Sequence, residues 1–170
     1  MSESVQELNL LSGLLAEPCE DSLAAIEELA PQLPWLSAQA IEQLKNTPLE
    51  HWQAEHTRLF ISGHPKTECV PFESVWTEGQ MMGEAATRIH QFYQAAGFTP
   101  DTALPEDFLG TELQFLAFLI QHHREQEEAL HEMLELLSTW VPKFATSVRI
   151  HAELQLYKDW AKRLEALFSA

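Results

Sequence analysis

The sequence is poor in cysteine and in basic residues. Cys19 and Cys69 are its only cysteines, and two isolated thiols provide neither a disulfide framework nor a zinc site. Lys and Arg total 10 against 26 Asp and Glu, which gives the 170 residues a formal net charge of −16. This charge argues against nucleic acid and anionic membranes as partners, because both attract basic surfaces. A cationic partner is electrostatically favoured, although the same charge also promotes solubility.

Long apolar segments are also missing. The N-terminal Met1-Ser2-Glu3-Ser4 lacks the basic and apolar regions of a signal peptide. No stretch reaches the roughly 20 apolar residues that span a bilayer. We therefore expect a cytoplasmic protein without membrane insertion, while the sequence gives no indication of its oligomeric state.

Motifs of the common enzyme classes are absent. The sequence contains no glycine-rich phosphate loop, no dinucleotide-binding fingerprint and no Gly-x-Ser-x-Gly nucleophile motif. These absences predict a protein that is not an enzyme and carries no cofactor.

One metal-site hypothesis stays open as an alternative. Glu128-Ala129-Leu130-His131 is the only Glu-x-x-His sequence, and His122 and His123 precede it. A metal-dependent helical-bundle enzyme would use these side chains as ligands. Adjacent histidines point about 100° apart on a helix, however, so a polar helix surface explains them as well.

Strand signals are lacking, and apolar residues recur instead at spacings of three and four. We predict an all-α fold with a single domain over residues 1–170 and roughly eight helices. Thr47 is predicted to cap one helix, and another is predicted to run from about Ser74 to a C-terminal stop at Gly97. Pro142 is predicted to break or kink a later helix.

The most apolar stretch, from about residue 106 to 121, is predicted to be a buried central helix. The apolar side chains from Leu113 to Ile120 would cover nearly every side of a helix, which is typical of a helix surrounded by others. Pro105 and the two acidic residues after it mark the start, because proline fits the first turn and carboxylates meet the positive end of the helix dipole.

Asp107, at the predicted start of this helix, is the strongest single candidate for binding. A carboxylate at a helix start is commonplace, but one at the edge of an apolar groove is also a good receptor for arginine. A set of aromatic residues that brackets the irregular segment 63–73 and the start of this helix accompanies it. Most should belong to the core, and an exposed subset would form a groove for an apolar peptide. The set comprises Trp52, Phe60, Phe72, Trp76 and Phe108.

Three stretches occur in an order and spacing that together are fairly specific. They are Glu55-His56-Thr57-Arg58-Leu59-Phe60, Val70-Pro71-Phe72-Glu73-Ser74-Val75-Trp76 and Pro105-Glu106-Asp107-Phe108-Leu109-Gly110-Thr111-Glu112-Leu113. The family patterns they match are aromatic-x-x-Leu-Phe, Pro-Pro-aromatic-x-Ser-Val-aromatic and Pro-x-Asp-His-x-Gly-x-Glu-Leu. The chain thus resembles the TorD/DmsD/NarJ-type chaperones, the redox enzyme maturation proteins specific for molybdoenzymes.

The resemblance implies chaperone work and an all-helical fold. Members bind the twin-arginine leader, or the N-terminal region, of a molybdopterin oxidoreductase catalytic subunit. They assist its cofactor insertion, its folding and the proofreading of its export. Carried onto this sequence, the motifs imply a client-binding site that includes Leu59, Phe60, Pro71, Phe72, Ser74, Trp76, Asp107, Phe108 and Gly110. Leu59, Phe60, Ser74 and Gly110 are expected mainly to shape this site.

Three positions depart from the family patterns. His56 replaces the first aromatic residue, Phe108 replaces the histidine of the Asp-His pair, and Val70 replaces the first proline. Asp107 remains, so arginine binding is still expected, whereas a polar contact from the lost histidine is not. A scaffold protein that joins two partners without leader specificity is the further alternative.

Overall fold

The computed structural model describes residues 2–169, and they form an all-α structure. Nine α-helices and one 3₁₀ turn occur in this range, and its only β-type pairing is an isolated bridge. The all-α prediction is confirmed. The helices are α1 (Ser2–Gly13), α2 (Ser22–Leu29), η1 (Ala30–Gln32), α3 (Ala38–Lys45), α4 (Leu49–Phe60), α5 (Glu73–Glu78), α6 (Glu84–Ala96), α7 (Leu109–Gln121), α8 (Glu127–His151) and α9 (Gln155–Phe168).

The chain divides into two compact units. The first combines residues 2–13 with 71–141, and the second combines residues 14–70 with 142–169. Helix α8 contributes its first part to one unit and its last part to the other. The single domain predicted over residues 1–170 stays a prediction, and its two end residues lie outside the described range.

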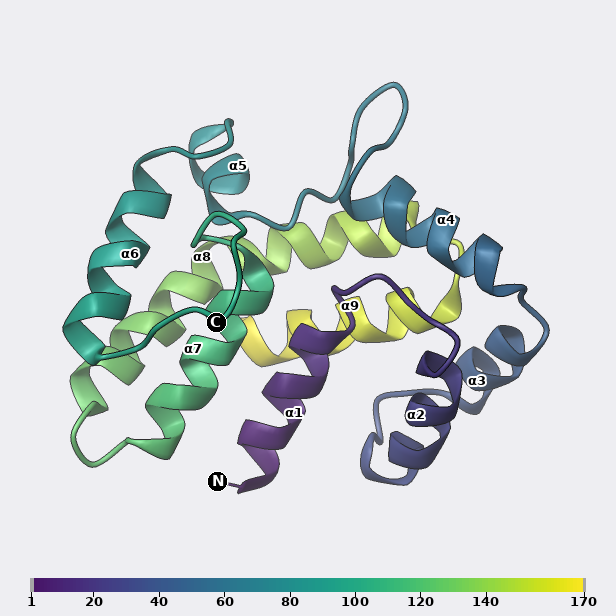
Figure 1. Cartoon of the computed structure of the whole chain (residues 1–170), viewed down its shortest axis with the longest axis horizontal. Coiled ribbons are helices and arrows are strands. Elements are labelled where there is room, and N and C mark those ends of the chain that lie inside the picture. The colour runs from purple at the N-terminus through teal and green to yellow at the C-terminus, as the bar shows by residue number, and fades with distance from the viewer. Residues whose placement is uncertain (1, 170) are drawn as a thin grey trace. The chain divides into compact units, whose positions relative to one another are not determined.

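The first unit is built around α7, as predicted for the most apolar stretch. Nine of its residues are buried, and α1 lies beside it (Figure 1). Leu8 and Leu11 of α1 are buried, and the hydroxyl of Ser12 donates to the Gly110 carbonyl at 2.8 Å. The helix begins at Leu109, about three residues later than predicted, because the preceding residues form a turn that pairs with another segment.

Two helices stand where one was predicted between Ser74 and Gly97. Helix α5 ends at Gly79, which has a left-handed φ of 77°, and α6 begins at Glu84. Met82 between them also has a positive φ, of 55°. Gly79 and Gly83 delimit the break, so a local signal for it was present in the sequence. Gly97 terminates α6 with a φ of 78°, as predicted.

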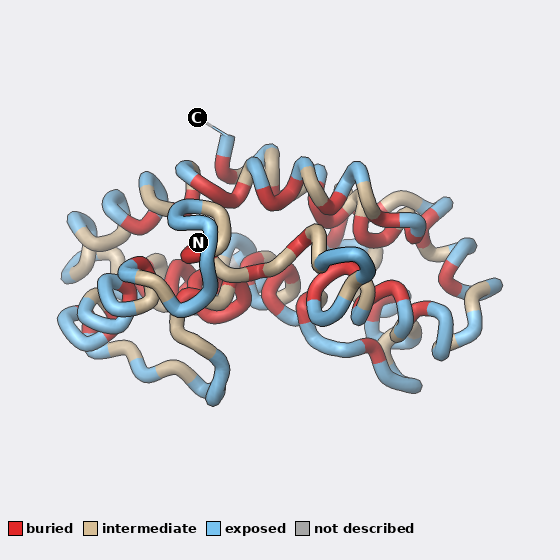
Figure 2. The backbone as a smooth tube through the Cα atoms, turned by 90° about the horizontal axis from the view of Figure 1, so that it is seen from above, coloured by how far each residue is buried: buried red, intermediate tan, exposed pale blue. Residues whose placement is uncertain are grey.

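The second unit packs around Phe60, near the end of α4. Its ring contacts Tyr157 and Trp160 of α9 in edge-to-face geometry, at centroid distances of 5.5 and 5.8 Å. Trp52 of α4 donates its indole N–H to the Tyr157 hydroxyl at 3.1 Å, which satisfies a buried polar pair. Buried and exposed stretches alternate along the helices in Figure 2, as expected for amphipathic helices around a core.

The predicted break at Pro142 and the predicted cap at Thr47 are wrong, and a kink at Pro142 stays a prediction. Pro142 lies inside the continuous helix α8 and does not end it. Phe144, two residues further on, is fully buried, and burial of such residues offsets the roughly 3 kcal/mol cost of an internal proline. Thr47 does not cap α4; its hydroxyl donates to the Gln43 carbonyl at 2.6 Å, and Pro48 occupies the cap position.

Across residues 2–169 every helix is too short or too polar to cross a membrane.

Candidate functional site

Two of the three motif segments lie side by side in the first unit. Phe72 and Phe108 form an isolated antiparallel bridge. Two backbone hydrogen bonds flank it: Glu73 N–H donates to the Asp107 carbonyl at 3.0 Å, and Leu109 N–H donates to the Pro71 carbonyl at 2.8 Å. The segments 71–76 and 105–110 therefore form one structural element, although about 30 residues separate them in sequence.

Asp107 is buried at this junction rather than placed on a surface. It has no solvent exposure, and its Oδ2 accepts hydrogen bonds from the Ser74 backbone N–H at 2.8 Å and from the Ser74 hydroxyl at 2.6 Å. The carboxylate thus takes the place of a cap for the short helix α5, whose own N-cap residue Phe72 offers no side-chain acceptor. Its Oδ1 has no hydrogen-bond partner within residues 2–169.

Two further buried acids, Glu73 and Glu112, interact electrostatically with Asp107. Glu73 is 1% exposed and Glu112 is fully buried. Desolvation raises the pKa of Glu73 from 4.5 to about 7, with Asp107 adding to the rise and the Arg88 charge opposing it. Desolvation also raises the pKa of Glu112 well above its usual value; the neighbouring acids add to this, and the Trp140 side chain opposes it. The unit therefore holds a cluster of three buried acids.

The aromatic residues of the two segments are partly accessible. Phe72, Trp76 and Phe108 are each half-buried, and the rings of Phe72 and Phe108 lie 5.4 Å apart. Gly110 permits this arrangement, because a Cβ built on it would lie 2.5 Å from the Phe108 ring. Of the five aromatic residues considered in the sequence, these three are half-buried, and a peptide groove formed by them stays a prediction.

The third motif lies in the core of the second unit. Leu59 and Phe60 are 1% and 3% exposed. His56 is buried as well, and its Nε2–H donates to the Leu15 carbonyl at 2.8 Å. This burial is what a shaping role for Leu59 and Phe60 requires, and their part in client binding stays a prediction.

Comparisons with known proteins place the chain in a family. The sequence profile described as nitrate reductase delta subunit matches residues 13–146, most of the chain. The chain belongs to the nitrate reductase delta subunit family. Among solved structures it is similar to a redox enzyme maturation protein from Archaeoglobus fulgidus, with 27% identity and a TM-score of 0.70, covering 95% of this chain and 91% of that one. A comparison with curated proteins found no match.

These findings confirm the resemblance to the redox enzyme maturation proteins. Together they indicate a maturation chaperone for molybdoenzymes, without identifying its client.

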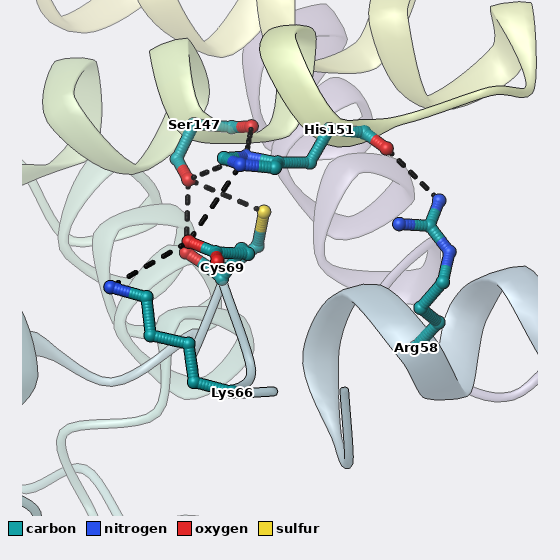
Figure 3. A network of polar contacts seen from close by, with 6 residues as sticks. Arg58, Lys66, Cys69, Ser147 and His151 are labelled. Atoms are coloured by element: carbon teal, nitrogen blue, oxygen red, sulfur yellow. Dashed lines mark hydrogen bonds and ion pairs between the residues drawn. The ribbon is translucent and has the colours of Figure 1, made fainter. Parts of the chain in front are cut away.

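In this delta-subunit family member, a polar network in the second unit joins the segment after α4 to the end of α8 (Figure 3). Ser147 donates its hydroxyl proton to the Glu68 carbonyl at 2.9 Å, and Cys69 Sγ lies 3.5 Å from the same hydroxyl. Arg58 reaches the His151 carbonyl at 2.9 Å. These contacts hold the irregular segment against α8, and Lys66 extends the network to the Glu68 carboxylate at 3.9 Å.

In the same network the side chain of His151 contacts both Ser147 and Glu68, but this arrangement does not activate a nucleophile. His151 Nδ1 lies 2.8 Å from the Ser147 carbonyl, which only accepts, so Nδ1 carries the proton. It then has no lone pair to take the proton of the Ser147 hydroxyl, 3.3 Å away. Burial raises the pKa of the Cys69 thiol to about 11, so this thiol is also a poor nucleophile. The network is structural.

The residues of the metal hypothesis are spread over the turn between α7 and α8. His122 caps the end of α7, and its Nδ1 lies 2.9 Å from the Phe118 carbonyl. Glu128 and His131 are exposed on α8, where His131 contacts the Glu135 carboxylate. Within the described part of the chain no three His, Cys, Asp or Glu side chains are close enough to hold a metal ion.

Glu73 and Glu112 were not singled out as functional residues from the sequence. Glu112 lies three residues after Leu109 and four before Leu116, on the buried face of α7. A charged residue within an apolar helical stripe was the available signal. No such pattern marks Glu73, because its burial depends on the bridge between Phe72 and Phe108.

Proposed function

We propose that this protein is a cytoplasmic chaperone that binds the twin-arginine leader, or the N-terminal region, of a molybdopterin oxidoreductase catalytic subunit. It assists the subunit through cofactor insertion, folding and export proofreading, and it does so by binding rather than catalysis. The observation that supports this best is the joining of segments 71–76 and 105–110. Their junction combines half-buried aromatic side chains with buried acids, which suits a peptide that pairs arginines with an apolar stretch.

The charge of the chain supports the same proposal. A net charge of −16 attracts a basic leader over a distance, while the aromatic side chains provide apolar contact at short range. Phe72, Trp76 and Phe108 are the side chains that we expect to meet the apolar part of the leader.

Asp107 has a specific place in the proposal. Since the carboxylate is buried and bonded to Ser74, we expect it to position α5 and to contribute its charge to the arginine site. Asp107→Asn retains an acceptor for Ser74 and removes the charge. We expect this variant to fold and to bind the leader more weakly, by on the order of 1–3 kcal/mol. Wild-type affinity in the folded variant would leave Asp107 a structural role alone.

Calorimetric titration tests the proposal. Wild-type protein is titrated with a panel of twin-arginine leader peptides, each paired with a control in which both arginines are glutamine. We expect binding to at least one leader and its loss in the matching control. Phe108→Ala should weaken that binding, whereas Leu134→Ala, at an exposed apolar position on α8, should not.

A scaffold without leader specificity predicts another result. It would bind a folded oxidoreductase subunit and no isolated leader, so a pull-down with the mature subunit decides between the two functions.

A further inference from the structure

A pocket opens between α5, α6 and α8 of the first unit. Its volume is about 450 Å³, within the range of small-ligand sites. Its walls combine apolar and charged side chains from the three helices. The lining residues are Glu73, Ala85, Arg88, Ile89, Gln91, Phe92, Glu132 and Leu136.

Glu73 gives this pocket an unsatisfied carboxyl group. The residue is 1% exposed, and its Oε1 has no hydrogen-bond partner among the described residues. Asp107, bonded to Ser74, adds a second negative charge behind it. A buried carboxylate without a donor is costly, so a ligand that brings a cation and hydrogen-bond donors would be stabilised there.

Arg88 is the cation whose charge acts on this carboxylate, and it is loosely held. Its charge favours the ionised form of Glu73, but its side chain is 65% exposed and pairs with Glu78 at 3.7 Å. Glu78 also accepts a hydrogen bond from the Ala85 N–H at 2.8 Å, so it remains in place at the start of α6. Arg88 can therefore leave the neighbourhood of Glu73 and keep a partner.

The remaining walls suit the stem of a long cationic side chain. Ile89 and Leu136 provide apolar surface, and the half-buried ring of Phe92 offers a face for a planar cation. Glu132, exposed on α8, adds a negative charge to the lining. With two carboxylates against one guanidinium, the pocket attracts a cation and repels an anion.

We propose that this pocket takes one arginine side chain of the client's N-terminal segment, which displaces Arg88 and binds the Glu73 carboxylate. This inference rests on the proposed function and names the part of the ligand that the pocket recognises. It also explains why a buried acid faces a pocket of this size. The bound arginine, through its guanidinium or its backbone, then also contacts Gln91 and Glu132 at the sides of the pocket.

The experiment measures leader affinity at pH 8, where Glu73 is mostly ionised, for four variants. Glu73→Gln removes the anchoring charge, and we expect roughly a tenfold or greater loss, since a charged hydrogen bond is lost. Glu132→Gln should lose less leader affinity than Glu73→Gln. Glu135→Gln makes the same charge change at an exposed α8 position outside the pocket lining and should bind like wild type.

Arg88→Ala is the decisive variant, because the proposal predicts a gain. If Arg88 competes with the incoming arginine, its removal should tighten binding several-fold. A loss of affinity would mean that Arg88 itself contacts the ligand, and it would overturn the proposal. Leaders with lysine in place of arginine separate guanidinium from ammonium recognition, and we expect the guanidinium form to bind more tightly.

A small probe keeps this inference separate from the proposed function. N-acetyl-arginine amide is added to isotopically labelled protein, and amide chemical shifts are followed by NMR. Shifts at Ile89, Phe92 and Leu136 that disappear in Glu73→Gln support the pocket, even if no leader binds and the proposed function fails. Leader binding that is unchanged in Glu73→Gln and Arg88→Ala refutes the pocket and leaves the proposed function intact. Absence of both leader and probe binding overturns both.

Discussion

Replacing Glu73 by glutamine should change how the stability of the protein depends on pH. Glu73 is buried beside Asp107, and its pKa rises from 4.5 to about 7 on folding. A group with a raised folded pKa stabilises the fold fully below its unfolded pKa, and this contribution is lost as the pH rises through about 7. Glutamine carries no proton to lose, so Glu73→Gln should lack this loss.

The shift gives the size of the effect. A rise from 4.5 to about 7 corresponds to at most about 3 kcal/mol of stability lost between pH 4.5 and pH 8. Part of this loss falls below pH 5, so we expect about 2 kcal/mol between pH 5 and pH 8. Between pH 5 and pH 8 the free energy of unfolding of Glu73→Gln should therefore rise by this amount relative to wild type.

Urea denaturation followed by far-UV circular dichroism measures both proteins at the two pH values. The change with pH is the quantity compared, because it cancels the constant difference between a protonated carboxyl group and an amide. Glu128→Gln, at an exposed position on α8, serves as the control and should show no such change. A difference between Glu73→Gln and wild type that is the same at pH 5 and pH 8 would refute the argument that Glu73 is desolvated.

Three further outcomes are expected. Gly110→Ala should destabilise the protein by roughly 1–3 kcal/mol in urea denaturation and weaken leader binding, because the added Cβ would lie 2.5 Å from the Phe108 ring and force it away. Glu55→Ala should lower the unfolding free energy by roughly 1–3 kcal/mol, since the carboxylate accepts two backbone N–H groups just before α9; an unchanged midpoint would contradict this. A thiol reagent should react with one cysteine in the native protein and two after denaturation, because Cys19 is exposed and Cys69 is buried with a pKa of about 11.

Local sequence signals predicted the helices well where helix formation depends on local residues. The apolar run of α7 and the glycine that ends α6 were both identified from the sequence. The break between α5 and α6 was missed, although Gly79 ends α5 with the same left-handed conformation by which Gly97 ends α6. The break predicted at Pro142 was wrong for a different reason, since packing around α8 outweighs a local preference.

The candidate site was predictable in its residues but not in its burial. The motifs pointed to Asp107 and the aromatic residues near it, and Phe72 and Phe108 do meet. Asp107 is enclosed and bonded to Ser74 because two distant segments pair, and no spacing in the sequence encodes this pairing. The burial of Glu73 follows from the same pairing, and so does the pocket it lines.

The bridge between Phe72 and Phe108 has a practical consequence for chimeric proteins. Backbone hydrogen bonds tie residues 71 and 73 to residues 109 and 107, and a side-chain bond ties Ser74 to Asp107. If only one of these two segments is exchanged between two relatives, the new segment pairs with a segment from the other relative, whose side chains do not match it. Client preference should therefore transfer only when segments 71–76 and 105–110 are exchanged together. Each single exchange should lower the stability of the protein by more than half of the loss caused by the paired exchange.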